Sequence, residues 1–239
     1  SFWEQLKEDF YVPKNNDPAL DTNLELFFNY PGVWAIINYR IANKLYYKGW
    51  KKLSRVVSGI SSFLTKTDIH PACTIGRRVF IDHAIGVVIG ATAIIEDDVL
   101  IYQGVTLGGV SLNKGKRHPT VKSNTVIGSG AKVLGNITIG ANSKVGANSV
   151  VVCDVPDNST AVGVPARIIK KDDKNCKLAH GDLPDINKEM FKYLLDRIHL
   201  VEVALKEEDG IDLSQKDEKL ENDYNSFIEA MNSIKRKDS

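Results

Sequence analysis

The sequence contains few cysteines and no long apolar run. Its three cysteines are too few for the disulfide framework of a secreted scaffold, and their spacing does not match a metal-binding motif. No apolar stretch approaches the length of a membrane-spanning helix, and the N-terminal residues lack the apolar core of a secretory signal. These absences predict a protein of the reducing cytoplasm that does not enter a membrane.

An excess of charge of either sign is also absent. The 31 basic residues are balanced by 30 acidic residues, which leaves a formal net charge of +1. This balance gives no electrostatic reason to expect binding to nucleic acid or to an anionic membrane surface. With 239 residues the chain is long enough to bury a substantial core. We therefore expect a globular protein whose function depends on local sites.

The clearest feature that is present is an aliphatic residue at every sixth position. This period matches neither an α-helix nor a single β-strand, and it is typical of a solenoid in which three hexads form one turn. A second position four residues later, as at Cys73 and Ile85, is also predicted to face inward. The main inward positions are Ile69, Ile75, Ile81, Ile89, Ile95, Ile101, Leu107, Val121, Ile127, Val133, Ile139, Val145 and Val151.

The repeats divide the chain into three predicted domains. Residues 1–66 have apolar residues at helical intervals, which predicts an N-terminal α-helical domain. Residues 67–170 hold the repeats and form the predicted parallel β-helix. Residues 171–239 are predicted to form a C-terminal tail with two amphipathic helices, which pack on the body or on each other, or else form a short oligomerising coil.

The period is interrupted twice, and both interruptions contain residues suited to catalysis. A slip of two residues carries Asp82 and His83, and an insertion of eight residues carries Arg117 and His118. Asp68 precedes His83 by close to one turn, so its carboxylate is placed to orient the imidazole as a general base. Arg117 supplies a fixed positive charge that suits a carboxylate substrate.

The same histidines also admit a metal-binding interpretation. Zinc is held by three convergent imidazoles in some enzymes, and the repeat region contains His70, His83 and His118. No local ligand spacing supports this alternative, so we do not expect a metal.

Five short motifs occur in a fixed order along the repeats. They are Asp68-Ile69-His70-Pro71-Ala72, Asp82-His83-Ala84, Thr106-Leu107-Gly108-Gly109, Arg117-His118-Pro119 and Gly163-Val164-Pro165-Ala166-Arg167. Together they resemble serine O-acetyltransferase, a family of left-handed β-helix hexapeptide acyltransferases, over roughly residues 17–170. The resemblance supplies the left-handedness, which the period alone does not determine.

The resemblance implies an activity and a set of partners. Acetyl is transferred from acetyl-CoA, the co-substrate, to the hydroxyl of L-serine, which gives O-acetyl-L-serine and CoA in cysteine biosynthesis. No covalent enzyme intermediate is needed, so we expect direct transfer in a ternary complex. The resemblance also implies a homotrimer with shared sites, leaves a hexamer open, and implies feedback inhibition by L-cysteine. A complex with O-acetylserine sulfhydrylase is not expected, because the sequence ends in Lys-Asp-Ser rather than in isoleucine.

The resemblance further implies a role for each matching residue. His83 is the implied general base, and Asp68 is the carboxylate that orients it. The implied serine pocket consists of Asp17, Asp82, Arg117 and His118, which replaces an interpretation of Asp17 as a helix cap. The residues implied in binding acetyl-CoA are Gly109, Ser129, Lys144, Ala147 and Arg167.

Some questions remain open at the level of the sequence. The oxyanion that develops on the thioester carbonyl needs donors, and either backbone N–H groups at Gly108-Gly109 or an imidazolium would serve. The nearest alternative function is a hexapeptide acetyltransferase for a sugar or another hydroxylated acceptor. Two further alternatives are a γ-type carbonic anhydrase with zinc between subunits and a solenoid used only for assembly.

Overall fold

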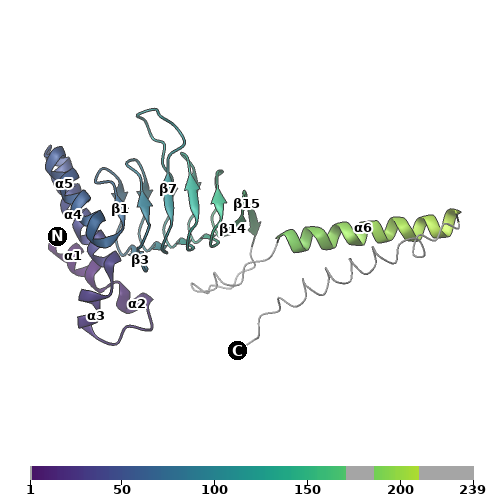
Figure 1. Cartoon of the computed structure of the whole chain (residues 1–239), viewed down its shortest axis with the longest axis horizontal. Helices are drawn as coiled ribbons and strands as arrows, with labels where there is room; N and C mark the ends of the chain where they lie inside the picture. Colours follow the sequence, from purple (N-terminus) through teal and green to yellow (C-terminus); the bar gives the residue numbers. More distant parts are fainter. Residues whose placement is uncertain (1, 171–185, 210–239) are drawn as a thin grey trace. The chain divides into compact units, whose positions relative to one another are not determined.

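The computed structural model describes residues 2–170 and 186–209, and the chain divides into two compact units. The first unit, residues 1–183, contains the helical region together with the solenoid (Figure 1). The described part of the second unit is one helix, α6 (Ile186–Asp209), which confirms the first of the two C-terminal helices. The second predicted helix lies outside the described residues. The predicted domain boundaries at residues 66 and 170 remain predictions, although α5 ends at Thr65 and β15 at Lys170.

Five helices precede the solenoid, as the spacing of apolar residues predicts. Pro31 occupies the first turn of α4, where its missing N–H is not needed. Lys66 adopts a left-handed conformation (φ 57°) that ends α5 and directs the chain into the first strand. The helices are α1 (Phe2–Tyr11), α2 (Pro13–Asn16), α3 (Asn23–Phe28), α4 (Pro31–Tyr47) and α5 (Lys51–Thr65).

Helix α5 turns its polar face, not its apolar face, toward the rest of the unit. Ser54, Ser58, Ser61 and Thr65 are buried, and the Ser54 hydroxyl donates to the Ala42 carbonyl at 2.7 Å. The apolar residues whose spacing predicts this helix are instead exposed in the single chain. They include Leu53, Val56, Ile60 and Leu64.

A buried ion pair fastens the helices to the first coil. Arg40 in α4 is 2.9 Å from the carboxylate of Asp9 in α1, and both side chains are almost fully buried. The same guanidinium donates to the carbonyls of Ile75 and Gly76 in the solenoid. Because every polar group of this pair has partners, the helical region is held at one defined position on the coil.

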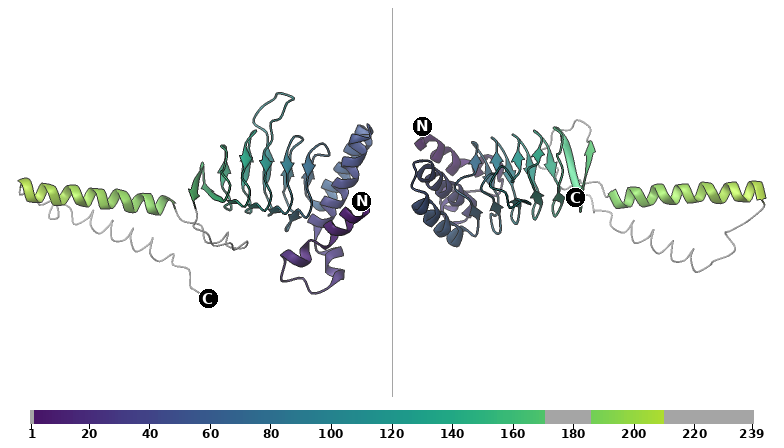
Figure 2. Two further views of the ribbon diagram at one scale, coloured as in Figure 1. Left: turned by 180° about the vertical axis from the view of Figure 1, so that it is seen from behind. Right: turned by 90° about the horizontal axis from the view of Figure 1, so that it is seen from above.

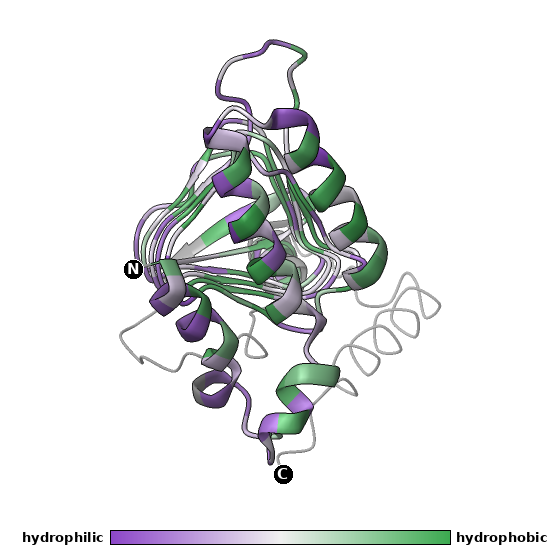
Figure 3. Cartoon of the chain, turned by 90° about the vertical axis from the view of Figure 1, so that its left-hand side faces the viewer, coloured by the Kyte–Doolittle hydropathy of each residue, from purple (hydrophilic) through white to green (hydrophobic). Residues whose placement is uncertain are grey.

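The solenoid has three sheets of parallel strands (Figure 2), and each of the first four coils contributes one strand to each sheet. Sheet A has the order β1-β4-β7-β10-β13, sheet B β11-β8-β5-β2, and sheet C β15-β14-β12-β9-β6-β3, where β14 and β15 form a closing antiparallel hairpin. Viewed from the helical end, the coils superimpose as a triangle (Figure 3). The strands are β1 (Asp68–Ile69), β2 (Thr74–Ile75), β3 (Phe80–Ile81), β4 (Val88–Ile89), β5 (Ile94–Ile95), β6 (Leu100–Ile101), β7 (Thr106–Gly108), β8 (Thr120–Val121), β9 (Val126–Ile127), β10 (Lys132–Leu134), β11 (Thr138–Ile139), β12 (Lys144–Val145), β13 (Val150–Val151), β14 (Ser159–Gly163) and β15 (Ala166–Lys170).

The core lies inside the triangle and confirms the main inward positions. All the aliphatic residues of the six-residue series are buried, and so is Cys73. The prediction for Ile85 was wrong, because this side chain is 63% exposed. His83 and Ala84 adopt left-handed conformations (φ 57° and 53°), and this local turn moves the inward position to Val87, which is fully buried.

The two interruptions lengthen a coil without breaking the register. Asp68 pairs with Val88, whereas Lys132 pairs with Val150 in a regular turn. Thr106 pairs with Lys132 across the turn that contains the long insertion. The extra residues therefore protrude at the corners of the triangular solenoid, and the strands before and after them keep their parallel pairing.

Candidate active site

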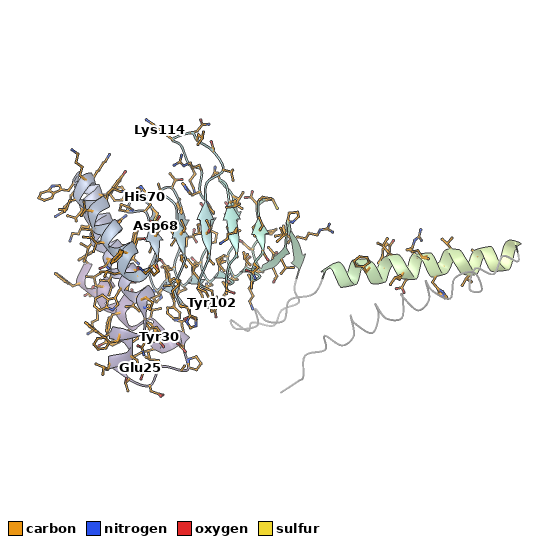
Figure 4. The ribbon with its side chains drawn as sticks, in the orientation of Figure 1. Glu25, Tyr30, Asp68, His70, Tyr102 and Lys114 are labelled. Atoms are coloured by element: carbon orange, nitrogen blue, oxygen red, sulfur yellow. The ribbon has the colours of Figure 1, made fainter. Side chains whose placement is uncertain are left out.

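The predicted site residues form two clusters at the two corners that border sheet A. The acidic cluster lies mainly where the chain passes from sheet C to sheet A, and the loop cluster lies where it passes from sheet A to sheet B. Figure 4 shows Asp68 and His70 on one side of the solenoid and Tyr30 and Tyr102 on the other. The acidic cluster consists of Asp17, Tyr30, Asp82, His83 and Tyr102, and the loop cluster of Asp68, His70, Thr92, Arg117 and His118.

Asp17 is fixed by two hydrogen bonds at the end of α2. Its Oδ2 accepts from the Tyr30 hydroxyl at 2.6 Å, and its Oδ1 accepts from the Ala19 N–H at 2.8 Å. The bond from Tyr30, followed by that from Ala19, lowers the pKa of Asp17 below its ordinary value. Asp17 therefore stays ionised and points in a set direction at neutral pH.

Asp82 has the opposite electrostatic setting. Burial raises the pKa of this carboxyl, and the negative charge of Asp17 raises it further, while His83 acts in the opposite direction. The cluster thus contains one firmly ionised carboxylate beside a second one that a cation would stabilise. Such a pair is suited to bind a cation such as a substrate ammonium group.

His83 is the accessible imidazole of the molecule's acidic cluster. Its side chain is 72% exposed, and its Nε2 lies 3.8 Å from the Asp82 carboxylate. An exposed imidazole can come within hydrogen-bond distance of a substrate hydroxyl, as a general base requires. Among the described residues, no hydrogen bond or ion pair joins Asp68 to His83 within one chain, so the orienting role of Asp68 remains a prediction.

The loop cluster is built by the insertion, residues 109–119, which rises from the corner after β7. Lys114 lies at the top of this loop (Figure 4). The Arg117 guanidinium approaches the carbonyls of Ser111 and Asn113 at 3.4 and 3.3 Å, which folds the loop back on itself. The ammonium of Lys116 donates to the His118 carbonyl. These bonds bring two cations next to His118.

Both histidines of the loop cluster are held near the neutral state. Burial lowers the pKa of His118, and Arg117 and Lys116 lower it further. Burial also lowers the pKa of His70, and its Nδ1 accepts from the Ala72 N–H at 3.0 Å. Asp68 lies near His70 and acts against this shift. Apart from Asp68, the loop cluster therefore presents neutral imidazoles and cationic side chains, whereas the acidic cluster presents two carboxylates.

The predicted acetyl-CoA residues are divided in the same way. Ser129 follows β9 and Ala147 follows β12, so both lie along the corner that carries the acidic cluster. Lys144 lies in β12 and Arg167 in β15 of sheet C, close in the fold to that corner. Gly109 starts the loop at the other corner, where a Cβ would lie 3.2 Å from His118 Nε2. One chain does not bring all five together at one corner.

Three members of the clusters have no role in the sequence-based prediction: Tyr30, Thr92 and Tyr102. His70 enters that prediction only as a ligand of the alternative zinc site. Tyr30 contacts Asp17 from thirteen residues away, and Thr92 contacts His118 from 26 residues away in the neighbouring coil. Only His70 had a sequence signal, its place in the motif that follows Asp68.

No group of three or more His, Cys, Asp or Glu side chains in residues 2–170 and 186–209 is arranged to hold a metal ion. In the same residues, no helix is both long and apolar enough to cross a membrane.

Comparisons with known proteins agree with this geometry. The family model described as bacterial transferase hexapeptide (six repeats) matches residues 118–153. A serine acetyltransferase of Bacillus pumilus (strain SAFR-032) is 49% identical over 195 residues, which cover 81% of this chain and 90% of the relative.

Solved structures give the same result. A serine acetyltransferase in complex with cysteine is 43% identical, with a TM-score of 0.68 over 70% of each chain. A serine acetyltransferase from Brucella abortus strain S19, in complex with coenzyme A, is 42% identical, with a TM-score of 0.69 over 72% of this chain and 69% of that structure.

Proposed function

The chain belongs to the serine acetyltransferase family, and we propose how its two clusters divide the family's reaction between them. The protein is an acyltransferase whose solenoid is a left-handed parallel β-helix of hexapeptide repeats. It transfers the acetyl group of acetyl-CoA to the hydroxyl of L-serine, with O-acetyl-L-serine and CoA as products. The remaining question is which residues perform each step.

His83 is the general base of this proposal. A serine hydroxyl is a weak nucleophile until its proton is removed in place, so the base must reach hydrogen-bond distance of that oxygen. The exposed ring of His83, with Asp82 beside it, meets this requirement. The imidazolium that forms is stabilised by the carboxylates of the acidic cluster. The hydroxyl oxygen then attacks the thioester carbonyl carbon. The C–S bond to CoA breaks, and the His83 imidazolium gives its proton to the departing CoA thiolate.

The two ends of the serine head group match the two clusters. Asp17 and Asp82 bind the ammonium, because they are adjacent carboxylates with room for one cation. Arg117 and His118 bind the carboxylate, as a cation and a ring N–H donor respectively. A neutral sugar would use neither the acidic pair nor the arginine, so the charge pattern favours an amino-acid acceptor.

The division into two clusters supports a site shared between copies of the chain. Both clusters border sheet A, one at each of its long edges. In a ring of three chains with sheet A toward the axis, the acidic edge of one copy meets the loop edge of the next. Opposite charges then face each other at the contact. We propose that this homotrimer brings Asp68, Arg117 and His118 of one copy to His83 of its neighbour.

Acetyl-CoA occupies the groove between the same two edges. Ser129, Ala147, Lys144 and Arg167 line it from one copy, and Gly109 contributes from the neighbouring loop. Backbone N–H groups beside Gly109 lie near the thioester in this arrangement, and they can stabilise the oxyanion without proton transfer. Backbone donors agree with the lowered pKa of His118, because a neutral ring does not supply an imidazolium donor.

L-cysteine is the proposed feedback inhibitor. A related serine acetyltransferase has been solved in complex with cysteine. Cysteine has the same ammonium and carboxylate groups as serine, and it carries a thiol in place of the hydroxyl. It therefore satisfies Asp17, Asp82, Arg117 and His118 as serine does. We expect competition between cysteine and serine.

The observation that carries this proposal is the pairing of an acidic cluster with a cationic cluster on the two edges of one sheet. CoA release from acetyl-CoA, measured with L-serine and with simple sugars as acceptors, tests it. We expect turnover with serine and none above background with sugars. Release with a sugar but not with serine would establish the alternative function.

A further inference from the structure

The loop cluster contains a hydroxyl group to which none of the roles above applies. Thr92 lies in the corner that follows β4, one coil away from the loop. Its Oγ1 is 3.0 Å from the backbone nitrogen of Arg117 and 3.2 Å from that of His118. The same oxygen is 2.8 Å from Nδ1 of the His118 ring. One side chain therefore contacts both residues of the proposed carboxylate site.

The hydrogen-bond capacity of this hydroxyl determines the direction of each bond. A threonine hydroxyl has two acceptor lone pairs and one proton to donate. The backbone N–H groups of Arg117 and His118 occupy both lone pairs. The single proton is then directed at His118 Nδ1, so this ring nitrogen must be an unprotonated acceptor. The backbone N–H of Thr92 points at the same nitrogen from 3.3 Å.

We propose that Thr92 is a positioning residue that holds His118 as the neutral tautomer with its proton on Nε2. This ring N–H is then a fixed donor to the serine carboxylate. The identity of the acceptor rests on the proposed function, whereas the tautomer rests on the geometry of the free protein.

The other side of the ring is shaped to present Nε2. A Cβ on Gly90 would lie 2.0 Å from His118 Cδ2 and 2.1 Å from Nε2, so the ring packs directly against the glycine backbone. A Cβ on Gly109 would lie 3.2 Å from the same nitrogen. Among the described residues, Nε2 has no hydrogen-bond partner. The ring N–H is thus the one polar group of His118 left for a ligand.

The charges around the ring favour the same state. Lys116 and Arg117 face it from the loop, and His70 faces it from the corner after β1, with Asp68 and Arg55 beyond. The nearest full charges are positive, and they oppose a second proton on the ring. His118 is therefore suited to donate, and His83 on the other edge is suited to accept.

Nuclear magnetic resonance of the full-length protein with ¹⁵N-labelled histidine tests the tautomer directly. The long-range ¹H–¹⁵N spectrum of wild type is expected to show His118 protonated on Nε2 at neutral pH, with the signal assigned by His118→Asn. Thr92→Val removes the hydroxyl at constant shape, and it should raise the pKa of His118 and admit the Nδ1–H tautomer. Thr92→Ser keeps the hydroxyl and should resemble wild type. An Nδ1–H ring in wild type, or identical spectra for wild type and Thr92→Val, would overturn the proposal.

Steady-state kinetics test the consequence for serine binding. Thr92→Val is expected to raise the KM for serine by about tenfold, the size of one lost hydrogen bond to a charged group, and to leave kcat and the KM for acetyl-CoA nearly unchanged. Thr92→Ser should restore the KM.

Thr125→Val is the matched control, because Thr125 also donates a buried hydroxyl bond, to Gly140 at 2.9 Å, at a corner away from both clusters. Equal losses in Thr92→Val, Thr92→Ser and Thr125→Val would mean that Thr92 only supports the fold. Absence of turnover with serine in wild type would instead overturn the proposed function, and the spectra would still decide the tautomer.

Discussion

The two edges of sheet A use the same residue type in opposite ways. His83 on the acidic edge is 72% exposed and lies beside carboxylates, whereas His118 on the loop edge is 7% exposed and lies beside cations. Burial and the positive charges of Arg117 and Lys116 lower the pKa of His118, whereas the ring of His83 is open to a substrate. Under the proposed function, the surroundings and not the residue type distinguish the proposed base from the proposed donor.

The edges also differ in how the chain builds them. The acidic edge depends on a short slip with two left-handed residues, His83 and Ala84, and on Asp17 and Tyr30 from the helical region. The loop edge depends on a long insertion anchored by Thr92. The later turns along the acidic edge place Gly104, Gly130 and Asn148 in left-handed conformations, and none of these has a titratable side chain. Arg78 and Asp98 are left-handed at the corners between sheets B and C, where they pair with each other at 2.6 Å. Each interruption is therefore what places chemistry on its edge.

The largest expected effect follows from removing the base on the acidic edge. His83→Ala should lower kcat by about 10²–10⁴-fold, the usual contribution of general acid–base catalysis. Because the side chain is mostly exposed, the thermal unfolding temperature and the oligomeric state should not change. Turnover of CoA within a few-fold of wild type would show that His83 is not the base.

Mixing two inactive variants tests whether the edges belong to different copies. His83→Ala damages only the acidic edge and Arg117→Ala only the loop edge, so each homotrimer should be nearly inactive. In randomly mixed trimers roughly a quarter of the shared sites combine two intact edges, so about that fraction of wild-type activity should return. Co-purification of two differently tagged variants establishes mixing. A mixed trimer without activity would place each site inside one chain.

A smaller effect is expected from the hydrogen bond that fixes Asp17. Tyr30→Phe removes the 2.6 Å bond, so the pKa of Asp17 should rise toward its ordinary value and the carboxylate should lose its set direction. We expect about a tenfold higher KM for serine, because a bond to a charged group is lost. Tyr47→Phe is the control, since its hydroxyl bonds to the Ala72 carbonyl away from the acidic cluster. An equal KM in both variants would contradict the role of Tyr30.

The smallest effect concerns stability and pH. Burial raises the pKa of Asp82 in the folded state above its ordinary value, so the folded protein holds this proton more tightly than the unfolded chain. The free energy of unfolding therefore falls as pH rises through this window, and the deficit persists at neutral pH. Asp82→Asn should raise the unfolding temperature at pH 7 by roughly 2 °C, with a smaller gain near pH 4. A variant that is less stable at pH 7 would show that Asp82 is a stabilising charge.

The sequence predicts much of the solenoid because the repeat is a local rule. Every main inward position is buried, and corner residues such as Asn142 and Asn148 adopt a left-handed conformation that asparagine tolerates. Ile85 is the exception, since two left-handed residues shift the inward position to Val87. Helix α5 lies within the predicted helical region, but the exposure of its apolar face is not predicted, because which face is buried depends on the element against which the helix packs.

The candidate site is less predictable than the solenoid. The motifs identify His83, Arg117 and His118, and the family assignment is confirmed. The spacing of Asp68 suggests contact with His83, yet the turn that begins at Asp68 pairs it with Val88, and its charge acts on His70. Contacts such as Tyr30 with Asp17 and Thr92 with His118 join residues that no local pattern relates.

The sequence by itself determined the solenoid, its two interruptions and the reaction class, because each of these follows from short-range spacing and motif identity. Only the tertiary structure decided that the two interruptions lie at different edges of one sheet, and that one histidine is exposed while the other is buried and bonded to Thr92. The physical reason is that a six-residue period specifies which side chains face inward. The corner at which a residue lies, and the coil that packs against it, depend on the number of residues in every turn of the solenoid.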